Sequence, residues 1–128
     1  MTQTVEQRIA EARQLRNAGA GGPALAAYQA AAEQAAAEAS PGLRAHALRH
    51  VADLAREQGA IETALTAAAE AVALTHALGA PALDRANALR VHALTLQAQA
   101  QQLWAQAGAL YEQAGVPEGV AEARTHLT

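Results

Sequence analysis

The stretch HALRHVADLAREQGAIETALTAAAEAVALTHALG, from His46 to Gly79, decides the fold of this chain. On both sides of Gly59, apolar residues recur at steps of three and four positions, which is the period of a helix that buries one face. Gly59 lies between the two halves and Gly79 closes the second, and glycine is the residue that most readily takes the left-handed conformation at a helix end. The stretch therefore predicts two antiparallel helices joined by a tight turn.

Glycine and proline divide the rest of the chain in the same way, at AGAGGP (18–23), SPG (40–42), GAP (79–81) and AGVPEG (114–119). Ser40 precedes a proline and offers a hydroxyl acceptor to the free N–H groups of the helix that follows. The segment from Pro81 to Gly115 is too long for one ordinary helix. We therefore expect a break near Gln97 to Gln101, although neither glycine nor proline marks a turn there.

A shift of about forty residues superimposes one part of the chain on another, which is the signature of a helical repeat. The superimposed pairs are Ala12 with Ala52, Ala24 with Ala64, and Ala31 with Ala71. A shift of similar size places AHALR (45–49) on ANALR (86–90). Small side chains at equivalent places let paired helices cross at short distance, so we expect helix pairs that stack on one another.

This pattern resembles the tetratricopeptide repeat (TPR) family, in the longer-helix variety of bacterial regulators and kinesin light chains. The positions that carry the resemblance are Ala12, Leu15, Gly19, Ala24, Tyr28 and Ala31 in the first copy, and Ala52, Ala55, Gly59, Ala64, Ala68 and Ala71 in the second. The resemblance implies an all-α fold in which antiparallel helix pairs stack into a right-handed superhelix. An unrelated antiparallel helical bundle is the alternative that the same residues leave open.

The expected organisation is a single domain over residues 1–128. Its parts are repeat 1 at about 4–39, repeat 2 at about 41–79, a degenerate repeat 3 at about 81–115 and a capping helix at about 117–127. Aromatic residues make up only 2% of the chain, so alanine supplies much of its apolar content. A core of small side chains removes little area per residue from water, which favours a stacked helical layer over a deep globular core.

Charge and composition narrow the class of partner. The net charge is −3, and the nine basic residues, all arginine, form no dense run, so we expect no nucleic-acid partner. No window approaches the roughly 18 apolar residues of a membrane span, and we expect a cytoplasmic protein. The absence of cysteine excludes disulfides and cysteine-ligated zinc. All-arginine usage beside abundant alanine is typical of a GC-rich bacterial genome.

No catalytic constellation emerges from the sequence, because the carboxylates are spread over different helices. We therefore expect no enzyme activity and no cofactor. His46 and His50 lie four residues apart, a spacing that can place two imidazoles on one metal, and His92 is a candidate third ligand. A polar helix face is the more ordinary interpretation, and a metal-sensing domain is the alternative.

The TPR resemblance implies a concave groove lined by the first helix of each pair. Mapped onto this chain, the groove residues are Arg13, Arg16, Asn17, His46, Arg49, Asp53, Arg56, Asn87, Arg90 and Gln97. Arginine forks suit carboxylates, so we expect a protein or an acidic peptide as the partner of a non-enzymatic scaffold. A homodimer that pairs alanine-rich faces is the competing expectation.

Overall fold

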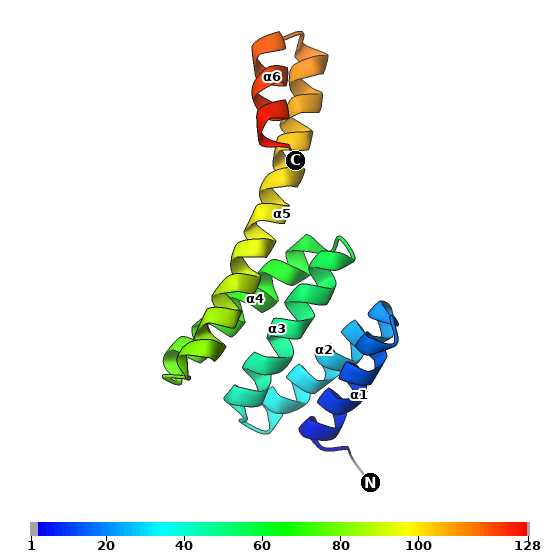
Figure 1. Ribbon diagram of the computed structural model, residues 1–128, viewed down its shortest axis with the longest axis vertical. Helices are drawn as coiled ribbons and strands as arrows, with labels where there is room; N and C mark the ends of the chain where they lie inside the picture. The colour runs from blue at the N-terminus through cyan, green and yellow to red at the C-terminus, as the bar shows by residue number, and fades with distance from the viewer. Residues whose placement is uncertain (1–2, 128) are drawn as a thin grey trace. The chain divides into compact units, whose positions relative to one another are not determined.

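The computed structural model describes residues 3–127 and is all-α over that range, with six helices and no strand. The helices are α1 (Val5–Asn17), α2 (Gly21–Ala37), α3 (Pro41–Glu57), α4 (Ile61–Ala77), α5 (Ala82–Ala114) and α6 (Pro117–His126) (Figure 1). The predicted fold class is therefore confirmed at the level of consecutive, packed helices. Within the described range, no helix is both long enough and apolar enough to cross a membrane.

The chain divides into two compact units, and the boundary falls inside α5. The first unit reaches to Thr95 and the second begins at Leu96. The first contains α1 to α4 and the N-terminal part of α5, whereas the second contains the remainder of α5 and α6.

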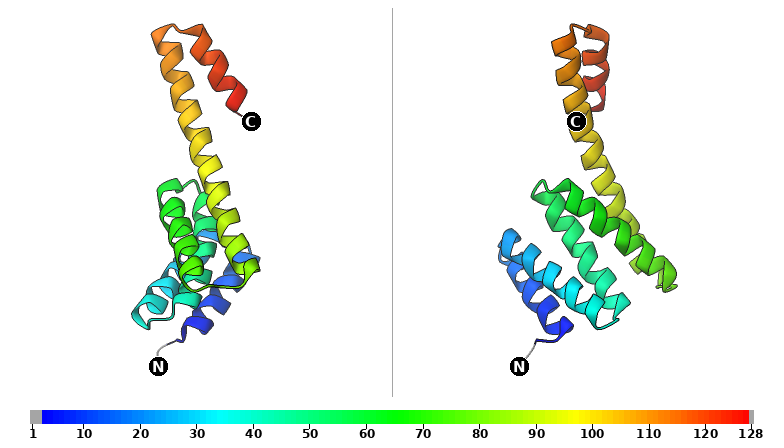
Figure 2. Two further views of the ribbon diagram at one scale, coloured as in Figure 1. Left: turned by 90° about the vertical axis from the view of Figure 1, so that its left-hand side faces the viewer. Right: turned by 180° about the vertical axis from the view of Figure 1, so that it is seen from behind.

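In the first unit each helix packs against the next, α1 on α2, α2 on α3 and α3 on α4, and α1 also touches α3 (Figure 2). The core between them is built from alanine more than from large residues. Ala12, Ala24, Ala52 and Ala64 are fully buried, each with 0% of its surface exposed. The alanines that the repeat pattern placed at helix crossings therefore lie in the core, where a side chain without a γ-carbon lets the helix backbones approach closely.

The turns share one hydrogen-bond pattern. After α1, the N–H of Ala20 donates to the carbonyl of Leu15, five residues earlier, and the turns after α2, α3, α4 and α5 repeat this bond. Such a turn needs one residue in the left-handed conformation. Gly59 and Gly79 supply it with φ of 79° and 59°, as the sequence predicts, but after α2 the residue is Ala39, with φ of 52°.

Helix starts differ from the prediction. Ser40 precedes α3, and Pro41 occupies the first turn as expected, but the Ser40 side chain makes no capping hydrogen bond. Its backbone lies at φ −109° and ψ 75°, away from the extended conformation that the capping residue usually adopts. A full capping box forms instead at Thr4, whose hydroxyl accepts from the N–H of Gln7 while the Gln7 side chain accepts from the N–H of Thr4.

The predicted break near Gln97 to Gln101 is wrong, because α5 is one continuous helix of 33 residues. The segment holds only glutamine and alanine at these positions, and both are good helix formers. No glycine is present there to take the left-handed conformation that ends the other helices. The expected third helix pair over 81–115 is therefore replaced by a single helix.

In the second unit, α6 packs along the C-terminal part of α5 (Figure 1). The predicted helix at 117–127 is present as α6, and its Ala123 is buried against the backbone of Gly108. Trp104 stacks on His126, with ring centroids 4.1 Å apart and planes 4° apart. Two features of the hairpin therefore fix its pairing, a close approach of small residues and one aromatic stack.

Candidate functional site

Polar side chains of α1 and α3 meet around Arg16, in the first unit. Its Nη1 donates a hydrogen bond of 2.8 Å to Nδ1 of His50. Its Nη2 lies 3.9 Å from Oδ2 of Asp53 and 3.6 Å from Oε1 of Glu57. Asp53 also pairs with Arg56, one helical turn further along α3, at 2.9 Å. One arginine of α1 is thus held by three side chains of α3.

His50 is fixed on its other sides by rings. It stacks on the buried ring of Tyr28 from α2, with centroids 4.6 Å apart and planes 9° apart. His46 approaches it edge-on, with centroids 4.8 Å apart. Because a guanidinium can only donate, Nδ1 of His50 must accept, so the imidazole is neutral and carries its proton on Nε2.

The surroundings of both histidines favour their neutral form. Burial, together with the nearby His46, Arg49 and Arg16, lowers the pKa of His50 to about 4, against an opposing effect of Asp53. Burial also lowers the pKa of His46, helped by Arg49 and Arg13. Near neutral pH, the positive charge around His46 and His50 therefore comes from the nearby arginines.

The ion pairs divide the arginines of this face into two kinds. Arg16 and Arg56 are neutralised by the carboxylates of Asp53 and Glu57. Arg13 and Arg49 act electrostatically on His46, and neither takes part in an ion pair among residues 3–127. We call Arg13, Arg49 and His46, on which both arginines act, the α1/α3 face. It presents two cations that form no ion pair within the described chain, and the carboxylate of Asp84 lines the same hollow as His46 and Arg49.

The structure brings together six of the ten predicted groove residues, which are Arg13, Arg16, His46, Arg49, Asp53 and Arg56. Asn17 is exposed at the end of α1, while Asn87 is half-buried and Arg90 exposed on α5. Gln97 belongs to the second unit, where it lines a hollow with Trp104 and His126. Of the five arginines predicted for the groove, two, Arg16 and Arg56, are used in internal ion pairs.

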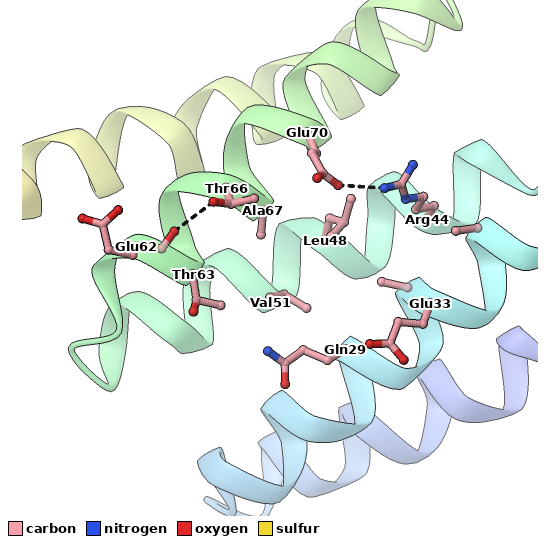
Figure 3. A pocket seen from close by; sticks show the side chains of 12 residues that line it. Gln29, Glu33, Arg44, Leu48, Val51, Glu62, Thr63, Thr66, Ala67 and Glu70 are labelled. Carbon is pink, nitrogen blue, oxygen red and sulfur yellow. Dashed lines mark hydrogen bonds and ion pairs between the residues drawn. The ribbon is translucent and has the colours of Figure 1, made fainter.

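A second hollow, of about 630 Å³, lies between α2 and α4 over one face of α3 (Figure 3). Its floor is apolar, with Leu48, Val51 and Ala67, and its rim carries Glu33 and Glu62. A further rim carboxylate, Glu70, is paired with Arg44 at 2.9 Å. The hollow is therefore acidic, unlike the α1/α3 face.

Sequence reasoning missed this hollow. The apolar period of the sequence predicts that Leu48 and Val51 are buried and that the glutamates are exposed. The structure agrees for Leu48 and Val51 and for the rim residues Glu33 and Glu62. The hollow arises because α2 and α4 pack on either side of α3 and leave the space above its apolar residues open. The packing of whole helices creates the hollow, and no single residue in the sequence indicates it.

The described structure does not bring the three histidines named as metal candidates together as ligands of one ion. Nδ1 of His50 is occupied by the hydrogen bond from Arg16. Within residues 3–127, no three side chains of the His, Cys, Asp and Glu types are placed to hold one ion. The His46 and His50 pair is instead part of the aromatic and arginine network that joins α1, α2 and α3.

Comparisons of the chain with protein-family models, with curated proteins and with solved structures gave no match.

Proposed function

We propose that this chain is a non-enzymatic, TPR-like interaction module that binds an acidic segment of a partner protein against its α1/α3 face. The observation that carries the proposal is the division of the arginines. Arg16 and Arg56 are held in ion pairs with Asp53 and Glu57, while Arg13 and Arg49 belong to no such pair within the described residues. Two cations without carboxylate partners, beside a rigid network, favour an anionic guest.

The nature of the guest follows from the chemistry of guanidinium. Arginine presents planar N–H donors that match a carboxylate, so aspartate, glutamate or a terminal carboxylate fits better than a neutral side chain. The lowered pKa of His46 keeps its imidazole neutral near pH 7, and the imidazole can then both donate and accept hydrogen bonds. Binding that depends on arginine charge alone is expected to vary little between pH 7 and pH 8.

The repeat organisation supports the same interpretation. Arg13 lies on α1 and Arg49 on α3, the first helices of the first two pairs. In a stack of helix pairs, the equivalent helices of successive pairs line one surface, which is how such proteins present an extended binding face. The buried crossing alanines and the shared turn pattern are the features that favour a TPR-like superhelix over an unrelated bundle.

Affinity capture from cells that contain the protein tests the proposal. The test variant is Arg13→Glu/Arg49→Glu, and the matched control is Arg85→Glu/Arg124→Glu, which changes the net charge equally at two exposed positions elsewhere. We expect the wild type and the control to retain the same partner and the test variant to lose it. Salt should weaken the captured complex, since exposed charges are screened at high ionic strength. Retention of the partner by the test variant would refute the role of this face.

The acidic hollow between α2 and α4 supports a second candidate, a docking site for a basic and apolar segment. Its apolar floor and glutamate rim are the specific observation in favour. The variant Glu33→Arg/Glu62→Arg separates the two candidates, because it reverses two exposed rim charges and leaves the α1/α3 face intact. Loss of the partner in this variant alone would move the binding site to the hollow.

A further inference from the structure

A row of exposed leucines runs along α5. Leu89, Leu96, Leu103 and Leu110 stand at every seventh position, and their exposed fractions are 56%, 46%, 56% and 64%. Alanines alternate with them at steps of three and four residues, at Ala86, Ala93, Ala100, Ala107 and Ala114. A strict seven-residue repeat with two apolar positions is the pattern of a helix that pairs with another helix in a coiled coil. We call these nine residues the leucine–alanine seam.

The sequence around the seam lacks charge to an unusual degree. From Val91 to Tyr111 there is no Asp, Glu, Lys or Arg, although much of this segment is exposed. Exposed helices are normally solubilised by charged residues, whereas the buried centres of protein interfaces are depleted of them. Glutamine fills the polar positions instead, at Gln97, Gln99, Gln102 and Gln106 among others. The segment thus has the composition of a covered surface.

Helix α6 leaves the leucines of the seam uncovered. It packs against the side of α5 that carries Trp104, Gly108 and Tyr111. Trp104 and Gly108 are half-buried, while Leu103 and Leu110 keep more than half of their surface in solvent. The apolar stripe therefore remains open along the helix that presents it.

We propose that a second copy of this chain covers the leucine–alanine seam, in a two-fold symmetric dimer whose α5 helices run antiparallel. When the two α5 helices run antiparallel, the seam of one copy is complementary to the seam of the other. With Leu96 opposite Ala107 of the second copy, Ala100 falls opposite Leu103 of the second copy. Leu89 and Ala93 likewise fall opposite Ala114 and Leu110 of the second copy, and only Ala86 lies outside the paired layers. Alternating large and small side chains fill such an interface evenly.

A parallel pair in register would be less favourable for two reasons. It would set leucine against leucine and alanine against alanine, so the alanine layers would leave voids between the helices. It would also bring Arg85 beside Arg90 of the second copy, in the flanking positions where opposite charges are preferred. Both reasons favour the antiparallel order.

Sedimentation equilibrium of the full chain tests the dimer. The wild type is expected at twice the chain mass of 13.1 kDa. The variant Leu96→Glu/Leu103→Glu places charge inside the seam and should sediment as a monomer. The control Gln102→Glu/Ala109→Glu adds the same charge at exposed positions of α5 outside the seam and should remain a dimer. Circular dichroism checks that all three proteins keep their helices.

A monomeric wild type, or a seam variant that stays dimeric while the helices are intact, would overturn the proposal. This outcome is independent of the α1/α3 face, since neither variant alters Arg13 or Arg49. The Leu96→Glu/Leu103→Glu monomer can therefore be used in the capture experiment to determine whether partner binding requires the dimer.

Distances between spin labels test whether the two α5 helices run antiparallel. Labels can be attached at single introduced cysteines, because the chain has no native cysteine to interfere. Single cysteines at Gln99 and at Gln113 occupy the same position in the seven-residue repeat. In an antiparallel pair the two labels at Gln99 lie close together. The distance between the two labels at Gln113 is larger than the distance at Gln99 by more than ~20 Å, given a rise of about 1.5 Å per residue. Equal distances at the two sites would show a parallel pair and refute the antiparallel arrangement.

Discussion

Arg16 of α1 donates a hydrogen bond of 2.8 Å to Nδ1 of His50 of α3, and this contact joins the first helices of two successive pairs. Because the acceptor must be a neutral imidazole, the contact and the protonation state of His50 depend on each other. The stack of His50 on Tyr28 extends the link to α2. Three helices of the first unit therefore share one polar network at the edge of an alanine core.

The first prediction concerns pH. The pKa of His50 is lowered to about 4 in the folded chain from 6.5, so between these values the unfolded chain binds more protons than the folded one. The free energy of unfolding should therefore fall as the pH drops from 6.5 toward 4. Solvent screening at this half-buried position reduces the contribution to about 1–2 kcal/mol. Urea unfolding at pH 4.5, 5.5 and 7 measures the change.

A His50→Gln variant provides the comparison. Glutamine keeps an acceptor for Arg16 but cannot gain a charge, so the difference between wild type and variant isolates the histidine from carboxylates that titrate in the same range. The variant should lose part of the dependence between pH 6.5 and 4. Identical pH profiles for the two proteins would show that His50 is protonated as easily in the folded as in the unfolded chain.

The second prediction concerns the turn after α2. Ala39 adopts φ of 52°, where glycine serves at the equivalent place in the other turns. The left-handed conformation costs a residue with a β-carbon roughly 1–2 kcal/mol. Ala39→Gly should therefore raise the midpoint of thermal unfolding, partly offset by the greater freedom of glycine in the unfolded chain. Ala26→Gly, at an exposed position in the interior of α2, is the control and should lower the midpoint.

The third prediction concerns the hydroxyl of Tyr28. The side chain is fully buried, and its Oη has no hydrogen-bond partner among the described residues. An unpaired buried polar group costs about 1–3 kcal/mol, so Tyr28→Phe should keep the stack on His50 and leave stability unchanged or higher. Chemical unfolding of the two proteins measures the difference. A loss of more than about 1 kcal/mol would mean that the hydroxyl is hydrogen-bonded in solution.

The fourth prediction concerns the helix crossing at Ala64. The residue has no exposed surface and belongs to α4, at the position equivalent to Ala24. Ala64→Leu should overpack the crossing and destabilise the chain by about 1–3 kcal/mol. Ala69→Leu makes the same change at an exposed position of the same helix and should have little effect. Equal stability of the two variants would argue against a close crossing.

Local patterns in the sequence predicted the helices well because their causes are local. A period of three and four apolar residues, with Gly19, Gly59 and Gly79 at the ends, placed the first four helices and their turns. The alanines expected at the crossings are buried for the same reason, since a repeat fixes which face of each helix meets its neighbour. The predicted break near Gln97 was wrong because no local signal in the sequence supported it.

The candidate site was predicted only in part. The resemblance to the TPR family implied that Arg13, Arg16, Arg49 and Arg56 share one face, because equivalent positions of successive first helices lie together in a stack. It did not show that Asp53 and Glu57 neutralise two of them. Whether a charge is cancelled depends on distances of a few ångströms between side chains of different helices, and residue spacing along one helix does not determine these.

The sequence by itself determined the helical class, the turn positions and the alanine core, because helix propensity and apolar period act within a few residues. The tertiary structure decided which arginines are held in ion pairs, where a hollow opens over α3, and which leucines of α5 stay in solvent. Each of these depends on how whole helices pack against one another. Burial and charge pairing are properties of that packing, and the same residues in the same order would give other surfaces if the helices crossed differently.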